Sequence, residues 1–349
     1  MKHEKILAVP TNVITGFLGV GKTSVIMQLL SQKPKHERWA VLVNEFGEIG
    51  VDGGLLSGTS PLDSHVFIRE VPGGCMCCAS ALPMQIALNQ LLTEAKPHRL
   101  LIEPTGLGHP QEVLQLLSNE YYQETLHLEK TVTLVDARNL SDSRYTEHDT
   151  FNQQLEIADI IVGNKADLYN EQDKQSLATY LNTKGYTPEH LYFVEHGAVG
   201  LDWLSEKKEA LSKRNNTTKV PHQHTHEHEH HHDHAHHHDS QSNIDQTPLE
   251  SGFIKAINQG EGYQSIGWRF AANQLFNHDK LIPFLTHIKA IRVKAIFMTN
   301  DGIFGYNNTP EDFNEFTLNK ADESRIEIIC DTLDDTWEAQ LKQLIIHVD

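Results

Sequence analysis

The chain has 349 residues, of which 39% are apolar and 22% are charged, and this composition predicts a folded protein of about two domains rather than a disordered or membrane-built one. Its 47 Asp and Glu against 29 Lys and Arg give a net charge of −18, so neither nucleic acid nor an anionic membrane surface is expected as a partner. No apolar run approaches the roughly 18–20 residues that span a bilayer, and the N-terminal residues lack the apolar core of a signal peptide, which together predict a cytoplasmic protein.

Short apolar runs alternate with amphipathic stretches over the first two hundred residues. In Met84–Glu94, for example, apolar residues recur every three or four positions, which is the spacing of one helix face. The alternation predicts βαβ units, and therefore an α/β domain with a mostly parallel sheet that helices cover on both sides. The predicted strands are Asn12–Thr15, Trp39–Asn44, Val66–Glu70, Leu100–Glu103, Thr131–Asp136, Ile160–Gly163 and Tyr192–Glu195, and the predicted helices include Ser24–Leu30, Met84–Glu94 and Gln111–Leu117.

A polar segment rich in His, Asp and Glu separates this region from the rest of the chain. It holds almost no aliphatic side chain between Val220 and Ile244, so it cannot bury enough apolar surface to offset the entropy of ordering. We therefore predict an α/β domain over residues 1–214, a flexible linker over residues 215–248 and a small α+β domain over residues 249–349. The elements predicted in the small domain follow the order β-α-β-β-β-α, over Gly267–Phe270, Lys280–Ile288, Ile291–Met298, Ile303–Tyr306, Arg325–Cys330 and Thr336–Ile346.

The eight residues 16–23 read G-F-L-G-V-G-K-T and fit the G-x-x-x-x-G-K-[ST] pattern of a phosphate-binding loop. The loop follows a predicted strand and opens a predicted helix, so its backbone N–H groups and the helix N-terminus can surround a phosphate. Lys22 is expected to bridge the β- and γ-phosphates, and the Thr23 hydroxyl to hold Mg²⁺. The predicted phosphate-binding residues are Gly16, Gly19, Val20, Gly21, Lys22, Thr23 and Ser24.

Two further strand ends carry residues suited to a guanine nucleotide. Asn164, Lys165 and Asp167 form an N-K-x-D sequence directly after an apolar strand, and an Asp carboxylate there can accept hydrogen bonds from guanine N1–H and N2–H₂, a donor pair that adenine lacks. Glu103 ends another apolar strand, where a carboxylate can hold Mg²⁺ directly or through water, and Gly106 follows with an N–H suited to the γ-phosphate. The sequence therefore predicts GTP as substrate and Lys22, Thr23 and Glu103 as the residues that carry its hydrolysis.

Three of the four cysteines form a C-x-C-C sequence after two glycines, at Cys75, Cys77 and Cys78. Three thiolates within reach of one ion suit Zn²⁺, Cu⁺ or Co²⁺, with a fourth ligand from a carboxylate, a histidine or water. A redox-active dithiol is the alternative.

Together with N-E-F-G-E over residues 44–48 and E-P-T-G-L-G-H-P over residues 103–110, these motifs make the chain similar to the CobW-type branch of the metallocentre-assembly GTPases, closest to its YeiR-type zinc-binding members. The resemblance covers the whole chain, because these proteins also carry a His-rich stretch and a small C-terminal domain. It implies a GTPase that binds zinc and delivers it to a client metalloprotein, with Mg²⁺ as cofactor, Cys75, Cys77 and Cys78 as metal ligands and Glu48 as an additional one.

Some relatives carry an acid directly before the N-E-F-G-E segment, where this chain has Val43, so a metal site that uses that acid is not expected here. Two alternative functions remain open. The protein could be a zinc store in which GTP turnover is incidental, or a cobalt or nickel chaperone of the same family.

Eleven of the 23 histidines lie in a tract within the predicted linker. Neutral imidazoles bind Zn²⁺, Ni²⁺ or Co²⁺, so the tract is expected to collect or buffer metal as an auxiliary site, unless it is a solvated linker with incidental metal affinity. Its members are His222, His224, His226, His228, His230, His231, His232, His234, His236, His237 and His238.

Overall fold

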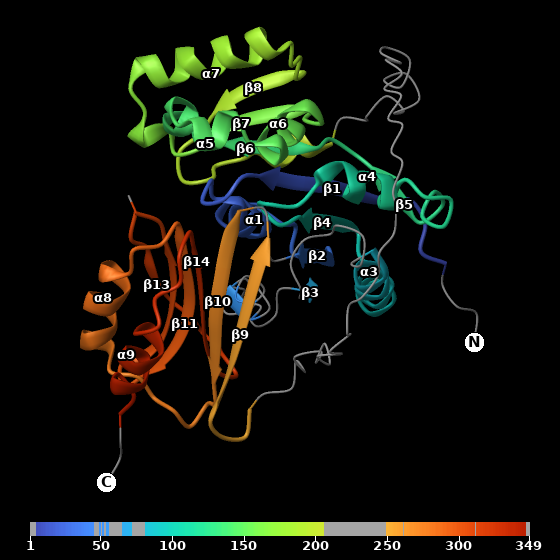
Figure 1. Cartoon of the computed structure of the whole chain (residues 1–349). Helices are drawn as coiled ribbons and strands as arrows, with labels where there is room; N and C mark the ends of the chain where they lie inside the picture. The colour runs from blue at the N-terminus through green and yellow to red at the C-terminus, as the bar shows by residue number, and fades with distance from the viewer. Residues whose placement is uncertain are drawn as a thin grey trace, which may run out of the picture.

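The structure is a computed structural model that describes residues 5–44, 49, 51, 54–55, 65–71, 81–205, 249–260, 262–310 and 312–346. Two sheets account for most of this part of the chain (Figure 1). None of the helices in the described ranges combines the length and the apolar character that a bilayer crossing requires.

The first sheet is parallel throughout and has eight strands. Its order is β3-β2-β4-β1-β6-β7-β8, and β5 pairs with the start of β1 on the side opposite β4. The strands are β1 (Val9–Gly16), β2 (Trp39–Asn44), β3 (Val66–Val71), β4 (Arg99–Glu103), β5 (Leu126–Leu128), β6 (Val132–Val135), β7 (Ile160–Gly163) and β8 (His190–Phe193). Because parallel strands share a direction, their carboxyl ends meet at one edge, where Val43 lies opposite Glu103 and Asn44 opposite Val71.

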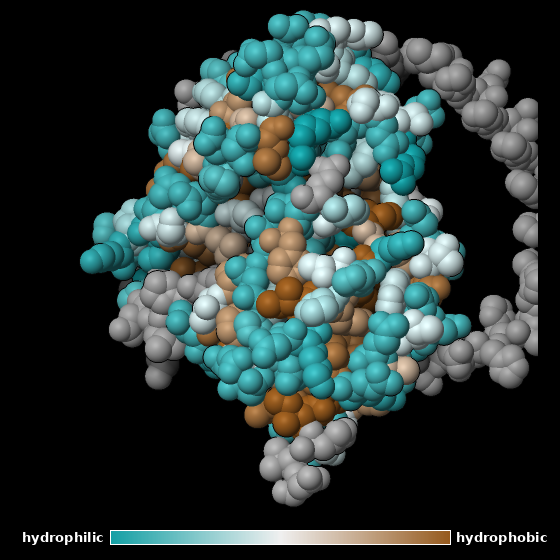
Figure 2. All heavy atoms as spheres, turned by 90° about the vertical axis from the view of Figure 1, so that its left-hand side faces the viewer, coloured by the Kyte–Doolittle hydropathy of each residue, from teal (hydrophilic) through white to brown (hydrophobic). Residues whose placement is uncertain are grey.

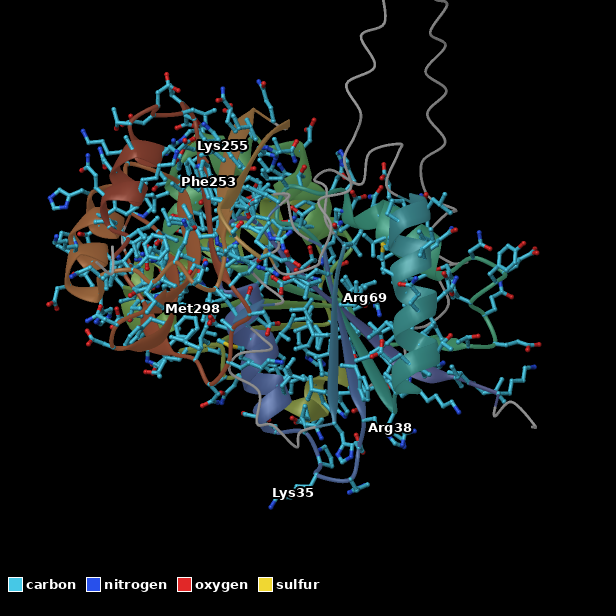
Figure 3. All side chains as sticks on the ribbon, turned by 90° about the horizontal axis from the view of Figure 1, so that it is seen from below. Lys35, Arg38, Arg69, Phe253, Lys255 and Met298 are labelled. Atoms are coloured by element: carbon cyan, nitrogen blue, oxygen red, sulfur yellow. The ribbon has the colours of Figure 1, made fainter. Side chains whose placement is uncertain are left out.

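Helices cover both faces of this sheet, as the strand–helix alternation predicts. One apolar cluster lies between the sheet and α1, α6 and α7, and a second lies between the sheet and α3 and α4. Figure 3 shows Arg69, on the edge strand β3, near α3, where its guanidinium donates to Gln90 at 2.9 Å and to Glu94 at 3.0 Å. The helices are α1 (Lys22–Ser31), α3 (Ala81–Ala95), α4 (Pro110–Leu117), α5 (Ser143–Thr146), α6 (Asp149–Glu156) and α7 (Glu171–Lys184), with short 3₁₀ turns at Ala137–Ser141, Ala166–Leu168 and Leu201–Leu204.

The second sheet is antiparallel, with six strands in the order β13-β12-β11-β14-β10-β9. The α+β expectation is confirmed, but the predicted order omits β9 and β13. In β9 the apolar residues are interrupted by polar ones, and β13 has only three residues, so neither gives a clear strand pattern. The elements are β9 (Phe253–Gly260), β10 (Tyr263–Phe270), α8 (His278–His287), β11 (Arg292–Thr299), β12 (Gly302–Asn308), β13 (Glu315–Thr317), β14 (Ser324–Cys330) and α9 (Trp337–Gln343).

The second sheet is buried on both faces. Its outer face packs under α8 and α9, with Trp268, Phe270 and Cys330 in the apolar core. Figure 2, which looks onto the side of these helices, shows a mostly hydrophilic surface with small separate apolar patches. Its inner face packs against described residues that follow β2, where Ile49 and Leu55 form an apolar cluster with Ile296.

Polar contacts reinforce this junction between the two sheets. Arg325, on β14, lies 3.6 Å from a carboxylate oxygen of Glu70, on β3, and donates to the Ile49 carbonyl oxygen at 3.4 Å. The same Glu70 accepts a hydrogen bond from the Gly54 N–H at 3.2 Å. The second sheet therefore contacts both β3, the edge strand of the first sheet, and the described residues that follow β2.

Gly267 tests this packing, because a Cβ atom at that position would meet Ile49 and would lie 2.9 Å from the Ile326 carbonyl oxygen. We expect Gly267→Ala to lower the free energy of unfolding by about 1–3 kcal/mol in equilibrium urea denaturation, as overpacking does. The control Ile257→Thr changes a residue that is 53% exposed on the adjacent strand and should stay within about 0.5 kcal/mol. Equal stability of the Gly267 variant and the unsubstituted protein would contradict the close packing of Gly267 against Ile49 and the Ile326 carbonyl group.

Candidate nucleotide site

The phosphate-binding loop is built by glycines in conformations that other residues rarely adopt. Gly16, the last residue of β1, has φ 144°, and a Cβ atom there would clash with the Leu134 carbonyl group. Gly21 has φ 95° and begins α1 as its N-cap, and a Cβ atom there would clash with the Asn164 side chain. The chain therefore turns sharply from strand to helix, which aims the first N–H groups of α1 into the loop.

The side chain of Lys22 is folded into this loop. It is 3% exposed, and its ammonium group donates to the carbonyl oxygens of Gly16 at 2.9 Å and Phe17 at 3.1 Å. The pKa of Lys22 is lowered to about 7, chiefly by burial and next by the nearby Arg292 cation, with a smaller lowering by Lys294, while the Glu103 carboxylate acts in the opposite direction. A negatively charged ligand inside the loop would relieve this unfavourable concentration of positive charge.

Thr23 and Glu103 meet beside Lys22, although 80 residues separate them in sequence. The Thr23 hydroxyl donates to a Glu103 carboxylate oxygen at 3.2 Å, and both side chains are almost fully buried. Gly106 closes the same space, because a Cβ atom on it would lie 3.0 Å from Lys22 Nζ and 3.1 Å from the Leu18 nitrogen. A buried hydroxyl next to a buried carboxylate is an oxygen donor set of the kind that Mg²⁺ prefers.

Asn164 holds two loops together with its side-chain amide. Its Nδ2 donates to the Val20 carbonyl oxygen at 2.9 Å, and its Oδ1 accepts from the Gly197 N–H at 3.0 Å. Both ends of the amide are thus used within the protein, and the residue is 2% exposed. Asp167, by contrast, is exposed and lines a cavity, so its carboxylate can accept hydrogen bonds from a ligand.

This cavity has a volume of about 290 Å³ and lies between the first domain and the second sheet. Phe316 and Leu55 meet at one wall of it, where a Cβ atom on Gly305 would contact both. Its lining from the first part of the chain includes Gly21, Thr23, Ser24, Asn164, Lys165 and Asp167, and its lining from the second sheet and adjoining loop includes Asn307, Asp312, Asn314 and Phe316.

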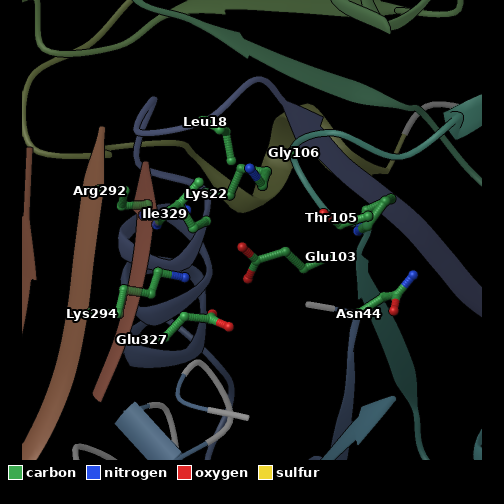
Figure 4. Close-up of a pocket in the computed structure, with 11 residues that line it drawn as sticks. Leu18, Lys22, Asn44, Glu103, Thr105, Gly106, Arg292, Lys294, Glu327 and Ile329 are labelled. Carbon is green, nitrogen blue, oxygen red and sulfur yellow. The ribbon is translucent and has the colours of Figure 1, made fainter. Parts of the chain in front are cut away.

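A second, smaller cavity is lined by Lys22 and shares no lining residue with the first. Its space of about 20 Å³ is roughly that of one water molecule. Figure 4 shows Lys294 and Glu327, from the second sheet, pointing into the same space as Glu103. The lining residues are Leu18, Lys22, Asn44, Glu103, Pro104, Thr105, Gly106, Arg292, Lys294, Glu327 and Ile329.

The structure thus brings Lys22, Thr23, Glu103 and Gly106 together, and places Asp167 with Ser24 at a neighbouring cavity. Sequence reasoning did not single out Arg292, Lys294 or Glu327, which it treated only as parts of β strands. The predicted metal residues Glu48, Cys75, Cys77 and Cys78 and all eleven histidines of the tract lie outside the described residues. Within the described ranges, no group of three or more His, Cys, Asp and Glu residues is placed to hold a metal ion.

The parallel sheet with a phosphate loop between its strand β1 and helix α1 defines a P-loop nucleotide-binding protein. Residues 10–187 match the profile of the CobW/HypB/UreG nucleotide-binding domain, and the chain belongs to this family. It is 38% identical over 336 residues, 96% of this chain and 97% of the other, to the zinc chaperone YeiR of Escherichia coli strain K12. It is also 29% identical to the zinc chaperone YjiA of the same organism, over 62% of this chain and 67% of the other.

Among solved structures, the crystal structure of Zn(II)-bound YjiA GTPase from E. coli aligns with 97% of this chain and 99% of its own, with 16% identity and a TM-score of 0.41. The family and its P-loop fold support GTP hydrolysis as the general activity of the chain.

The two contacts of Asn164 give a prediction that separates its role from that of Asp167. We expect Asn164→Ala to lower the free energy of unfolding of the nucleotide-free protein by about 1–3 kcal/mol, because it leaves a buried carbonyl and a buried N–H without their partner. Asp167→Ala, at an exposed position, and the exposed control Asn182→Ala should change it by about 0.5 kcal/mol or less in the same urea titration. If Asn164→Ala behaved like the controls, Asn164 would not be the link between the two loops.

Proposed function

We propose that this protein is a Mg²⁺-dependent GTPase that acts as a nucleotide-gated zinc chaperone and delivers zinc to a client metalloprotein. The observation that carries the proposal is the contact of the Thr23 hydroxyl with the Glu103 carboxylate beside the buried Lys22 ammonium. This arrangement offers one cation for the phosphates and an oxygen pair for a divalent ion. The zinc part rests on the C-x-C-C sequence and on the 38% identity to a zinc chaperone along nearly the whole chain.

In the proposed mechanism, the N–H groups at the start of α1 and the Lys22 ammonium bind the β- and γ-phosphates. Lys22 must first exchange its hydrogen bonds with the Gly16 and Phe17 carbonyl oxygens for phosphate oxygens. Thr23 and Glu103 would hold Mg²⁺, which when bound neutralises charge on the β- and γ-phosphate oxygens. The Asp167 carboxylate would select guanine by accepting hydrogen bonds from the N1–H and N2–H₂ groups of the base. Asn164 would hold the loop that carries this carboxylate against the phosphate loop.

The sheet geometry supports a link between GTP and the proposed zinc site. β3 ends at Val71 and α3 begins at Ala81, so the segment that contains the cysteines starts at the carboxyl edge of the first sheet. Val71 lies opposite Asn44, the end of β2, and β2 lies beside Glu103. A change at the γ-phosphate would therefore act on strand ends that lead directly into the Cys75–Cys78 and Glu48 segments.

The base preference is tested by Asp167→Asn. An amide presents one acceptor and one donor, which suits xanthine, whose C2 carries a carbonyl group in place of the guanine amine. We expect the affinity for GDP to fall and that for xanthosine diphosphate to rise, each by roughly 10-fold or more, in fluorescence titrations. The control Asp202→Asn changes an exposed carboxylate outside the cavity lining and should alter neither affinity. An unchanged preference for GDP in Asp167→Asn would argue against Asp167 as the guanine-binding residue.

Nucleotide gating is tested by titrating Zn²⁺ against a competing chelator, first with Mg-GDP and then with a non-hydrolysable Mg-GTP analogue. We expect tighter zinc binding with the analogue, by about 5–150-fold, the range of ordinary coupling between two sites. Cys77→Ala should abolish this tight site, and deletion of residues 222–238 should leave it in place. Equal affinity in both nucleotide states, or loss of most zinc with the deletion alone, would instead favour a zinc store. The same titration with Co²⁺ and Ni²⁺ decides among the metals.

A further inference from the structure

Charged side chains on β11 point away from the core of their own sheet. Side chains alternate along a strand, so Val293, Ala295 and Phe297 lie on the face under α8 and α9, where Val293 and Phe297 are part of the apolar core. Arg292 and Lys294 lie on the opposite face. A charged face of this kind is normally in solvent, yet here Arg292 is 6% and Lys294 is 3% exposed.

These two cations line the small cavity that contains Lys22 and Glu103 (Figure 4). Glu327 lies directly opposite Lys294 in the pairing of β11 with β14, and its carboxylate lines the same cavity. The lining thus carries three basic and two acidic side chains, which leaves an excess of one positive charge when Lys22 is protonated and no cation is bound. A divalent cation held by Thr23 and Glu103 would increase that excess, so the charge of these side chains favours a strongly negative group beside them.

The position of the cavity identifies the part of the nucleotide that it faces. The proposed base-binding residue Asp167 lines the other cavity, and no residue lines both. The small cavity is lined by Glu103 and Gly106, which the sequence predicts to hold Mg²⁺ and to contact the γ-phosphate. Arg292 and Lys294 therefore approach Lys22 from the γ-phosphate end of the site.

Stability of the domain junction alone does not account for charge at these positions. Burying cations and carboxylates costs several kcal/mol per ion, and apolar side chains of similar volume usually stabilise such a junction equally well or better. The next inward-facing residue of β11, Ile296, is apolar and packs against Leu55 and Ile49. The same strand thus uses an apolar contact where it meets the segment after β2 and cations where it meets the phosphate loop.

We propose that Arg292 and Lys294 are catalytic residues of the GTPase, supplied by the second sheet of the same chain to contact the γ-phosphate oxygens and stabilise the charge on them during hydrolysis. In the reaction the water oxygen bonds to the γ-phosphorus as the bond to the β,γ-bridging oxygen breaks. The bond electrons remain on the bridging oxygen of GDP, and phosphate and a proton are released. Glu327 positions Lys294 from the neighbouring strand. This inference rests on the proposed GTP hydrolysis.

The test uses the full-length chain with Arg292→Met, Lys294→Met, the conservative Arg292→Lys, and the control Lys280→Met on the exposed side of α8. Affinity for Mg-GDP, affinity for a non-hydrolysable Mg-GTP analogue and the single-turnover rate of GTP hydrolysis are measured for each variant. We expect both Met variants to hydrolyse GTP about 100-fold or more slowly, as when one transition-state donor is removed. We expect the analogue affinity to fall about 10-fold while GDP affinity stays within about 3-fold, because GDP lacks the γ-phosphate.

Arg292→Lys should recover part of the rate, and Lys280→Met should match the unsubstituted protein. Hydrolysis within about 3-fold of normal in both Met variants would overturn the inference, since one lost donor should cost far more. An equal loss of GDP affinity, analogue affinity and rate would also overturn it, because it would reveal a structural role. If the unsubstituted protein does not hydrolyse GTP, the proposed function fails, and unchanged analogue affinity in the Met variants would then overturn the inference separately.

Discussion

The burial of both faces of the second sheet determines how the nucleotide site is assembled. One face packs under α8 and α9, and the other packs against the carboxyl edge of the first sheet, where strands end at Gly16, Asn44 and Glu103. Because inward-facing side chains of β11 and β14 line a cavity together with Lys22 and Glu103, residues from the two ends of the chain share one enclosed space. The two cavities lined by Lys22 and by Asp167 therefore have walls from both parts of the chain.

The junction between the second sheet and the first part of the chain combines apolar packing with polar contacts. Ile296, Leu318 and Ala256 pack against Ile49, Val51 and Leu55, so the described residues after β2 rest on the second sheet. Arg325 adds polar contacts to Glu70 and to the Ile49 carbonyl group. A movement at the γ-phosphate that displaced the segment after β2 would thus have to disturb the second sheet as well. This gives the second sheet a physical part in any response to the nucleotide.

The charge distribution within the site also depends on this assembly. The pKa of Lys22, on α1, is lowered chiefly by burial and also by two cations that belong to the second sheet. Glu103 partly offsets them, and the Thr23 hydroxyl orients one of its oxygens. The surrounding packing holds these positive charges together. The site therefore favours anionic ligands although the chain as a whole has a net charge of −18.

The local sequence was sufficient to predict most of the first sheet and the phosphate loop, because these depend on short-range constraints. The apolar runs predict buried parallel strands, and Gly16, Gly21 and Lys22 are fixed by the sharp turn from β1 to α1. The prediction missed β5, β9 and β13, which are short or interrupted by polar residues. The alternation along the predicted strands Gly267–Phe270 and Arg325–Cys330 agrees with the burial of Trp268, Phe270 and Cys330 in the second core, since strand alternation is a local property.

Only the tertiary structure decided which residues complete the site. The alternation of Arg292, Val293 and Lys294 predicts a strand with one polar face, but sequence cannot tell whether that face meets water or another domain. It meets the phosphate loop, about 270 residues earlier in the chain, because the inner face of the second sheet packs on the carboxyl edge of the first. Likewise, the N-K-x-D sequence identifies Asn164, but only the fold reveals that its amide nitrogen and oxygen bind Val20 and Gly197 of two other loops. Contacts between residues distant in sequence leave no periodic signal in either segment, and for that physical reason they appear only once the chain is folded.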